Sequence, residues 1–142
     1  LLRSEKGYLH VAADTDGSTA PQDIGWERVL RRSDDFVGKR SLLRPADRRT
    51  DRPEFVGFEA MGGCERLPVG SHVSDPDGGS QGYVTSSGFS PVLGRGVALG
   101  MLRGGSRRLG ERVFVIDHAG RSREAQVSAP CAYDPAGVRI DG

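Results

Sequence analysis

Residues 113–128 read Val-Phe-Val-Ile-Asp-His-Ala-Gly-Arg-Ser-Arg-Glu-Ala-Gln-Val-Ser, and this stretch decides the fold. Two short runs, 113–117 and 124–128, flank a polar segment that contains His118-Ala119-Gly120-Arg121. Strand-like runs on either side of a glycine-containing turn are typical of a β-hairpin. The apolar run Val113–Ile116 is unbroken, so we expect this strand to be covered on both faces. The stretch therefore predicts two antiparallel strands near the end of the chain.

Four more short strand candidates precede this hairpin, at residues 55–61, 70–74, 82–86 and 97–102. The segment Asp75-Pro76-Asp77-Gly78-Gly79 supplies a proline with a fixed φ and glycines for positive φ, and it predicts a second hairpin turn. Six short strands with such turns in about 85 residues favour a small closed barrel or a sandwich. We therefore predict a mainly β fold, with a small antiparallel β-barrel over residues 52–142.

The first 50 residues follow a different pattern, in which we expect an extended start, loops and one short helix. The helix is predicted around residues 39–43, with Asp34 or Asp35 as its N-cap and Pro45 as its end. Residues 44–53 are charged, poor in apolar residues and bracketed by prolines, as linkers are. We therefore predict a boundary at residue 51, between a region of residues 1–50 and the barrel.

Composition excludes several classes of function. The 142 residues have a net charge of +1, which argues against a general nucleic-acid binder. No run of about 18 apolar residues is present, so we expect no membrane span, and no signal peptide is visible, so we expect a cytoplasmic protein. Cys64 and Cys131 lack CxxC spacing and are predicted to be reduced. His10, His72 and His118 lack the spacing of a zinc site, so no metal is predicted.

Three motifs resemble known functional sites, but the residues around each motif argue against that function. Residues 94–100 nearly match a dinucleotide fingerprint, but they contain one residue too many and precede a strand rather than a helix. Asp14 and Asp16 resemble the opening of a calcium loop, but position twelve is not a glutamate, so we expect them to bond local backbone N–H groups in a turn. Residues 85–87 lack the surroundings of a nucleophilic serine, and we expect their hydroxyls to bond the backbone.

Four blocks, taken together, resemble the glycine-cleavage aminomethyltransferase family. They appear in the family's order and at compatible spacing, and they cover nearly the whole chain. The blocks are Leu2-Arg3-Ser4-Glu5-Lys6-Gly7-Tyr8, Asp35-Phe36-Val37-Gly38-Lys39-Arg40-Ser41-Leu42, residues 82–94 and residues 130–137. The sequence Glu5-Lys6-Gly7-Tyr8, together with Asp14-Thr15-Asp16-Gly17, is most similar to that of the α subunits of heterotetrameric sarcosine oxidases.

The resemblance implies how the chain is organised. Residues 1–50 would be the C-terminal end of an α/β folate-binding domain, and residues 52–142 would be the family's C-terminal β-barrel. The chain has no initiator methionine and starts inside patterned sequence, so we expect it to begin within a domain. Its expected partners are an upstream domain of the same polypeptide, the other subunits of a hetero-oligomer and a small-molecule substrate. Alone, the chain is expected to be inactive.

The activity implied by the resemblance is one-carbon transfer to tetrahydrofolate. Sarcosine would be oxidised at a flavin, and its methyl carbon would be captured as 5,10-methylenetetrahydrofolate while glycine leaves. The FAD and NAD sites and the catalytic carboxylate would lie elsewhere in the complex, so no catalytic residue is expected in this chain. Two alternatives stay open: a glycine-cleavage aminomethyltransferase or related folate-dependent demethylase, and a non-catalytic barrel that only packs against other subunits.

The resemblance also points to cofactor-binding residues. In this family the glutamate at the place of Glu5 holds the pterin ring, and the chemistry agrees, because an ionised carboxylate accepts two adjacent N–H groups of a reduced pterin. A basic residue near the cofactor corresponds to Arg28, Arg31 or Arg32, of which we favour Arg31 and keep Arg32 beside it. An arginine there suits the anionic glutamate tail of folate.

Overall fold

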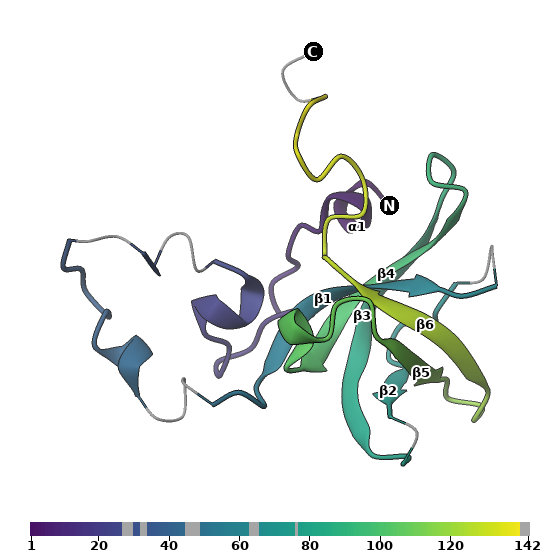
Figure 1. Ribbon diagram of the computed structural model, residues 1–142, viewed down its shortest axis with the longest axis horizontal. Coiled ribbons are helices and arrows are strands. Elements are labelled where there is room, and N and C mark those ends of the chain that lie inside the picture. Colours follow the sequence, from purple (N-terminus) through teal and green to yellow (C-terminus); the bar gives the residue numbers. More distant parts are fainter. Residues whose placement is uncertain (27–29, 32–33, 45–48, 63–65, 76, 140–142) are drawn as a thin grey trace.

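The computed structural model describes residues 1–26, 30–31, 34–44, 49–62, 66–75 and 77–139 (Figure 1). Within these residues, the α-helix α1 spans Leu2–Lys6. The strands are β1 Pro53–Ala60, β2 His72–Ser74, β3 Ser80–Ser90, β4 Arg95–Arg103, β5 Arg112–Ile116 and β6 Ser122–Ser128. The described residues also contain the short 3₁₀ helices η1 Pro21–Ile24, η2 Ser41–Leu43 and η4 Gly105–Arg107.

The strands form a closed barrel in the order β1-β4-β3-β2-β5-β6, and all neighbours are antiparallel. The predicted mainly β fold and small antiparallel barrel are therefore confirmed, and each of the six predicted strands overlaps an observed one. Both predicted hairpin turns are present. Gly78 has φ +82° between β2 and β3, and Gly120 has φ +75° between β5 and β6. Pro76 of the first turn lies outside the described residues.

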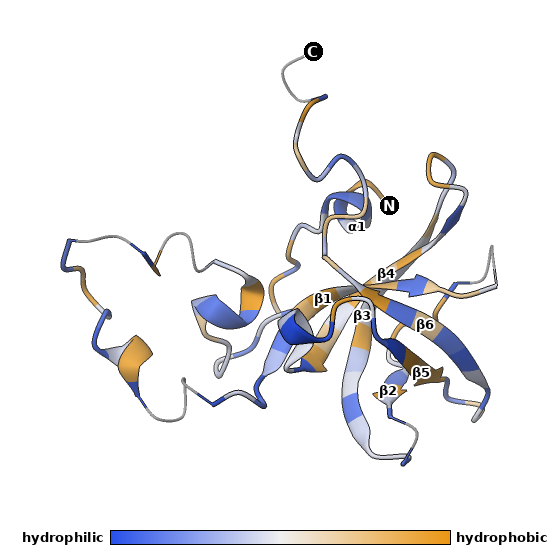
Figure 2. Cartoon of the chain, in the orientation of Figure 1, coloured by the Kyte–Doolittle hydropathy of each residue, from blue (hydrophilic) through white to orange (hydrophobic). Residues whose placement is uncertain are grey.

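The barrel interior is filled by inward-facing side chains, which alternate along the strands with outward-facing ones, as small barrels require. Hydrophilic and hydrophobic residues follow one another along β6, for example (Figure 2). Eleven buried residues form the main cluster: Val56, Phe58, Leu67, Val73, Val84, Ala98, Leu102, Val113, Val115, Ala125 and Val127. A smaller cluster of Phe55, Leu99 and Met101 faces the other side of the sheet, where Leu9 and Ile24 pack on it.

One prediction about the barrel is wrong. The unbroken run Val113–Ile116 was expected to be covered on both faces, but β5 alternates. Val113 and Val115 are 1 % exposed, whereas Phe114 is 36 % exposed. A small barrel closed on itself fills its interior with one face of each strand, and no other described element covers the outside of β5.

Two predictions for residues 1–50 are also wrong. The expected extended start is the helix α1. The short helix near residue 40 is present only as the 3₁₀ turn η2, and its N-cap is Arg40 without a side-chain hydrogen bond, not Asp34 or Asp35. Gly38 explains the short length, because its φ of +93° interrupts helical geometry just before η2. Pro45, the predicted end of the helix, lies outside the described residues.

The turn between β5 and β6 is organised by the carboxylate of Asp117. Its Oδ1 accepts the backbone N–H groups of Arg121 (3.0 Å) and Ala119 (2.9 Å), and its Oδ2 accepts the Arg121 Nε–H (2.8 Å). These bonds, first of all the one from the Arg121 backbone, lower the pKa of Asp117 from 3.8 to about 2. The charged carboxylate is therefore the form that stabilises the turn.

We expect Asp117→Asn to lower the unfolding temperature of the chain near neutral pH. The folded pKa lies below the unfolded one, so the carboxylate contributes fully above about pH 4 and loses its contribution as the pH falls towards 2. The difference in unfolding temperature between wild type and variant should therefore shrink over that window. Thermal unfolding followed at several values between pH 2 and pH 7 measures it. A difference that stays constant down to pH 2 would contradict this assignment.

Candidate functional site

The helix α1 carries Glu5, the residue on which the sequence places most weight. The backbone N–H of Glu5 bonds the Leu1 carbonyl (3.1 Å), and the N–H of Tyr8 bonds the Arg3 carbonyl (3.0 Å). Gly7, in the left-handed conformation, ends the helix. A helix of five residues is not stable alone in water. The position of Glu5 therefore depends on what holds α1 to the rest of the chain.

Asp14 is the first residue that holds α1 to the rest of the chain. It is 1 % exposed, and its Oδ2 accepts the His10 backbone N–H (2.6 Å) and an Arg3 guanidinium N–H (3.0 Å). The predicted bond to a local backbone N–H is confirmed at His10. The ion pair with Arg3 was not predicted, and it ties the turn at residues 10–14 to the helix.

A β-bulge connects this anchor to the barrel. The register of β3 against β4 shifts between Val84 and Ser86, which leaves Thr85 unpaired in the ladder. The Thr85 hydroxyl donates a hydrogen bond to Oδ1 of Asp14 and lies 3.1 Å from the Leu99 carbonyl oxygen. Bulges commonly redirect a side chain in this way. Because Asp14 also bonds α1, the bulge fixes the helix relative to the sheet.

Glu5 itself is buried, with 4 % of the residue exposed. Its backbone carbonyl accepts the N–H groups of Ala132 and Tyr133, each at 2.9 Å. Its side-chain Oε1 is buried and has no hydrogen-bond partner among the residues that the structure describes. A buried acceptor without a donor is unfavourable by about 1–3 kcal/mol or more, so such groups are few in folded proteins and each needs an explanation. This oxygen is suited to a donor from a ligand.

The structure describes one of the two arginines of the predicted site, Arg31. Arg31 is exposed, and it belongs to the segment between η1 and β1. Arg32 and Arg28 lie outside the described residues.

An open apolar groove of about 540 Å³ adjoins the C-terminal end of α1. Tyr8 and Trp26 are 61 % and 54 % exposed along it. Its lining comes from the end of α1, the end of η1, β1 and the chain after β6: Lys6, Gly7, Tyr8, Leu9, Ile24, Gly25, Trp26, Phe55, Ala129, Pro130 and Cys131. Glu5 is not part of this lining, although Lys6 and Gly7, which follow it in the sequence, are. The groove offers mainly apolar contact, with Lys6, Tyr8 and Cys131 as polar side chains in its lining.

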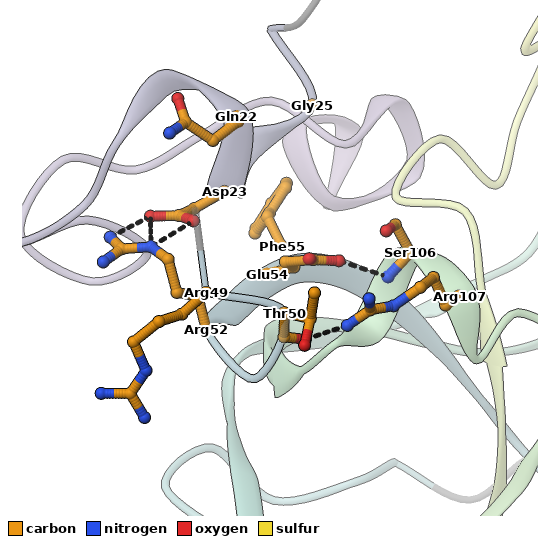
Figure 3. Close-up of a pocket in the computed structure, with 10 residues that line it drawn as sticks. All are labelled: Gln22, Asp23, Gly25, Arg49, Thr50, Arg52, Glu54, Phe55, Ser106 and Arg107. Atoms are coloured by element: carbon orange, nitrogen blue, oxygen red, sulfur yellow. Dashed lines mark hydrogen bonds and ion pairs between the residues drawn. The ribbon is translucent and has the colours of Figure 1, made fainter. Parts of the chain in front are cut away.

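A second hollow of about 390 Å³ lies between η1, the start of β1 and η4 (Figure 3). On one side Asp23 pairs with Arg52, whose Nε–H lies 2.9 Å from Oδ1. On the other side Oε2 of Glu54 accepts the Ser106 backbone N–H (2.7 Å). Because these groups bond one another, they hold η1 and η4 against the barrel.

The described part of the chain offers little support for a metal site or a membrane span. No group of three or more His, Cys, Asp or Glu residues there is arranged to hold a metal ion. Cys131 is a free thiol, and Cys64 lies outside the described residues. Among the described helices, none has the length and apolar character needed to cross a bilayer.

The sequence reasoning missed the charged residues that flank Glu5. Arg3 pairs with Asp14, and Lys6 pairs with Asp134 at 3.3 Å. The signal available was the alternation of charge in the block Arg3-Ser4-Glu5-Lys6. It does not say which of the 19 acidic residues elsewhere in the chain would lie opposite each cation.

Comparison with known proteins agrees with this architecture. The chain is 38 % identical to sarcosine oxidase subunit alpha of Corynebacterium sp. (strain U-96), over all of this chain and 15 % of the relative. It is 33 % identical to an aminomethyltransferase of Thermotoga sp. (strain RQ2), over 89 % of this chain and 34 % of the relative. The chain thus spans about a seventh to a third of the length of these relatives.

The fold also matches a solved structure. Aminomethyltransferase T of the glycine cleavage system from Bartonella henselae superimposes with a TM-score of 0.76, over 94 % of this chain and 37 % of that one, at 23 % identity. Residues 54–134 match the glycine cleavage T-protein C-terminal barrel domain, and this match takes in all six strands except the first residue of β1. With more than half of its residues in that match, the chain belongs to the family of the glycine cleavage T-protein C-terminal barrel domain.

Proposed function

We propose that this chain is the C-terminal region of a tetrahydrofolate-dependent one-carbon-transfer enzyme, most like sarcosine oxidase subunit alpha. Two observations support the proposal. Sarcosine oxidase relatives match the chain over its whole length. The single structural observation that carries it is the buried carboxylate oxygen of Glu5, which lacks a partner among the described residues.

Glu5 fits the chemistry of a reduced pterin. The bound tetrahydrofolate would supply the amines that accept the one-carbon unit. An ionised carboxylate receives two parallel N–H bonds from such a ring, and these charge-assisted bonds are about twice as strong as neutral ones. The role of Glu5 is to hold and orient the ring, an effect of positioning rather than of bond-breaking chemistry.

The remaining roles are divided between this chain and the rest of the enzyme. We assign residues 1–50 to the end of the folate-binding domain and residues 52–142 to the barrel domain. We assign Arg31 and Arg32 to the anionic tail of folate, a role that requires the segment between η1 and β1 to face the upstream domain. The catalytic carboxylate, FAD and NAD belong to other parts of the complex.

Glu5→Gln is expected to weaken binding of tetrahydrofolate to the full-length protein by about 10- to 100-fold, because hydrogen bonds to a charged group contribute roughly 1.5–3 kcal/mol. Glutamine keeps the size of the side chain but loses the charge and one acceptor. Calorimetric titration under anaerobic conditions measures the change. Glu124→Gln, an equal substitution at an exposed position of β6, is the matched control and should bind as the wild type does.

Two outcomes of this titration contradict the proposal. Equal affinities of wild type and Glu5→Gln would remove Glu5 from the site. No binding by the full-length wild type would favour the alternative, a barrel that only packs against other subunits.

A second enzymatic candidate is an aminomethyltransferase, because such relatives are 33–34 % identical over more than four fifths of this chain. It would take its carbon from an aminomethyl group on a lipoyl carrier instead of from sarcosine. Both candidates share the Glu5 site, so the folate titration does not separate them. Turnover of sarcosine with formation of glycine by the full-length protein supports the first, and turnover only with the aminomethylated carrier supports the second.

A further inference from the structure

The chain after β6 runs back across α1 (Figure 1). Ala132 and Tyr133 donate their backbone N–H groups to the carbonyl of Glu5, both at 2.9 Å. Gly7 lies so close to Pro130 that a Cβ on this glycine would stand 2.6 Å from the Pro130 carbonyl carbon. The C-terminal segment, defined here as residues 130–139, is thus in direct contact with the residue proposed to bind folate.

Lys6, the neighbour of Glu5, holds this segment from its other side. Its Nζ lies 3.0 Å from the Asp134 carbonyl oxygen, 3.3 Å from Oδ2 of Asp134 and 3.4 Å from the Tyr133 carbonyl oxygen. It also lies 6.0 Å from the centre of the Tyr133 ring. The side chains of Lys6 and Asp134 are only 20 % and 9 % exposed, so solvent screens this ion pair less than a surface pair.

Asp134 is arranged to receive Lys6. Its φ is +48°, an uncommon value for a residue other than glycine. Its carboxylate accepts the backbone N–H groups of Val138 (2.9 Å) and Arg139 (3.3 Å), which fixes the following turn. Partial burial alone would raise the pKa of Asp134, but the Arg139 N–H and the Lys6 ammonium outweigh it and hold that pKa below its ordinary value. The carboxylate therefore stays charged near neutral pH.

We propose that Lys6 and Asp134 form a latch that positions Glu5 by closing the C-terminal segment over α1. The inference rests on the folate-binding role proposed for Glu5. The physical reason is that α1 has one turn and little stability of its own, so the backbone of Glu5 is fixed by contacts on both sides. Arg3 and Asp14 hold the start of the helix, and the latch holds its end.

The test is binding of tetrahydrofolate by the full-length protein with Lys6→Met, which keeps all but one heavy atom of the length of the side chain and removes the charge and all three hydrogen bonds. We expect about a 10-fold loss of affinity, because misplacing a binding group is costly even when the group remains. Lys6→Arg, which keeps the charge, should restore most of the affinity. Arg95→Met removes a similar ion pair, with Glu59 at 2.7 Å between β4 and β1, and should leave affinity unchanged.

A double-mutant cycle separates positioning from general destabilisation. If Lys6 acts through Glu5, then Lys6→Met should cause no further loss of affinity in a Glu5→Gln protein. An unchanged affinity for Lys6→Met, a loss that adds fully to that of Glu5→Gln, or an equal loss in Arg95→Met would overturn the latch while the folate site stands. No binding by the wild-type protein would overturn the folate site and the latch together.

Discussion

Replacing Phe58 by alanine is expected to lower the free energy of unfolding of this chain by about 3–5 kcal/mol. Phe58 is 1 % exposed in the middle of β1, with its backbone paired to Ala98 of β4. A Cβ added to Gly100 would stand 2.9 Å from the ring, so the ring covers the open backbone of this glycine. An alanine leaves a cavity that neighbouring strands, bonded on both sides, have little freedom to fill.

Phe114→Ala provides the matched control, since it deletes the same ring from an outward position of β5 that is 36 % exposed. Urea denaturation of both variants and of the wild-type chain measures the two losses. We expect a loss of about 1 kcal/mol or less for Phe114, as for most surface substitutions. Similar losses at the two positions would mean that Phe58 is not part of a close-packed barrel core.

The barrel was predictable because its strands are coded locally. Short apolar or alternating runs mark the strands, and glycines such as Gly78 and Gly120 mark positive φ in the turns between them. The failed expectation for β5 shows the limit of this code. An apolar run such as Val113–Ile116 is compatible with cover on one face or on two, and only the complete sheet decides which.

The helix α1 was not predictable from local signals. Its five residues carry no N-cap side chain, and its geometry comes from contacts with residues far along the sequence. Arg3 reaches Asp14 and the bulge of β3, and Lys6 reaches Asp134, 128 residues away. Such pairings depend on the closed barrel, which brings the chain after β6 back to its beginning. No pattern within residues 1–8 contains that information.

The candidate site likewise combines residues that the sequence predicts with properties that only the assembled fold creates. Glu5 was predicted from a resemblance that spans most of the chain, and its role in folate binding stays a prediction. Its burial, and the lack of a partner for its Oε1 among the described residues, are properties of the assembled fold. Arg31 was predicted from the same resemblance; it is exposed in the segment between η1 and β1, and its role in folate binding also stays a prediction.

Gly7→Ala is the second large effect that we expect, a loss of about 2–5 kcal/mol in the free energy of unfolding. Two separate terms contribute. The φ of +68° puts an alanine in the left-handed region, at about 1–2 kcal/mol. The new Cβ would also stand 2.6 Å and 2.7 Å from the carbonyl carbon and oxygen of Pro130, and backbone atoms cannot rotate aside as a side chain can. Overpacking of this kind adds about 1–3 kcal/mol.

Gly94→Ala separates the two terms, because Gly94 has a φ of +64° and a methyl group added there would meet nothing within 4 Å beyond its own chain neighbours. It should therefore lose only the conformational term, and the difference between the variants in urea denaturation gives the cost of the contact with Pro130. Equal losses would show that α1 and the C-terminal segment are not tightly packed. If α1 moves aside instead of the whole chain losing stability, the amides of Ala132 and Tyr133 should exchange faster, because their acceptor is the carbonyl of Glu5. Either result ties one methyl group on Gly7 to the position of the carboxylate two residues before it.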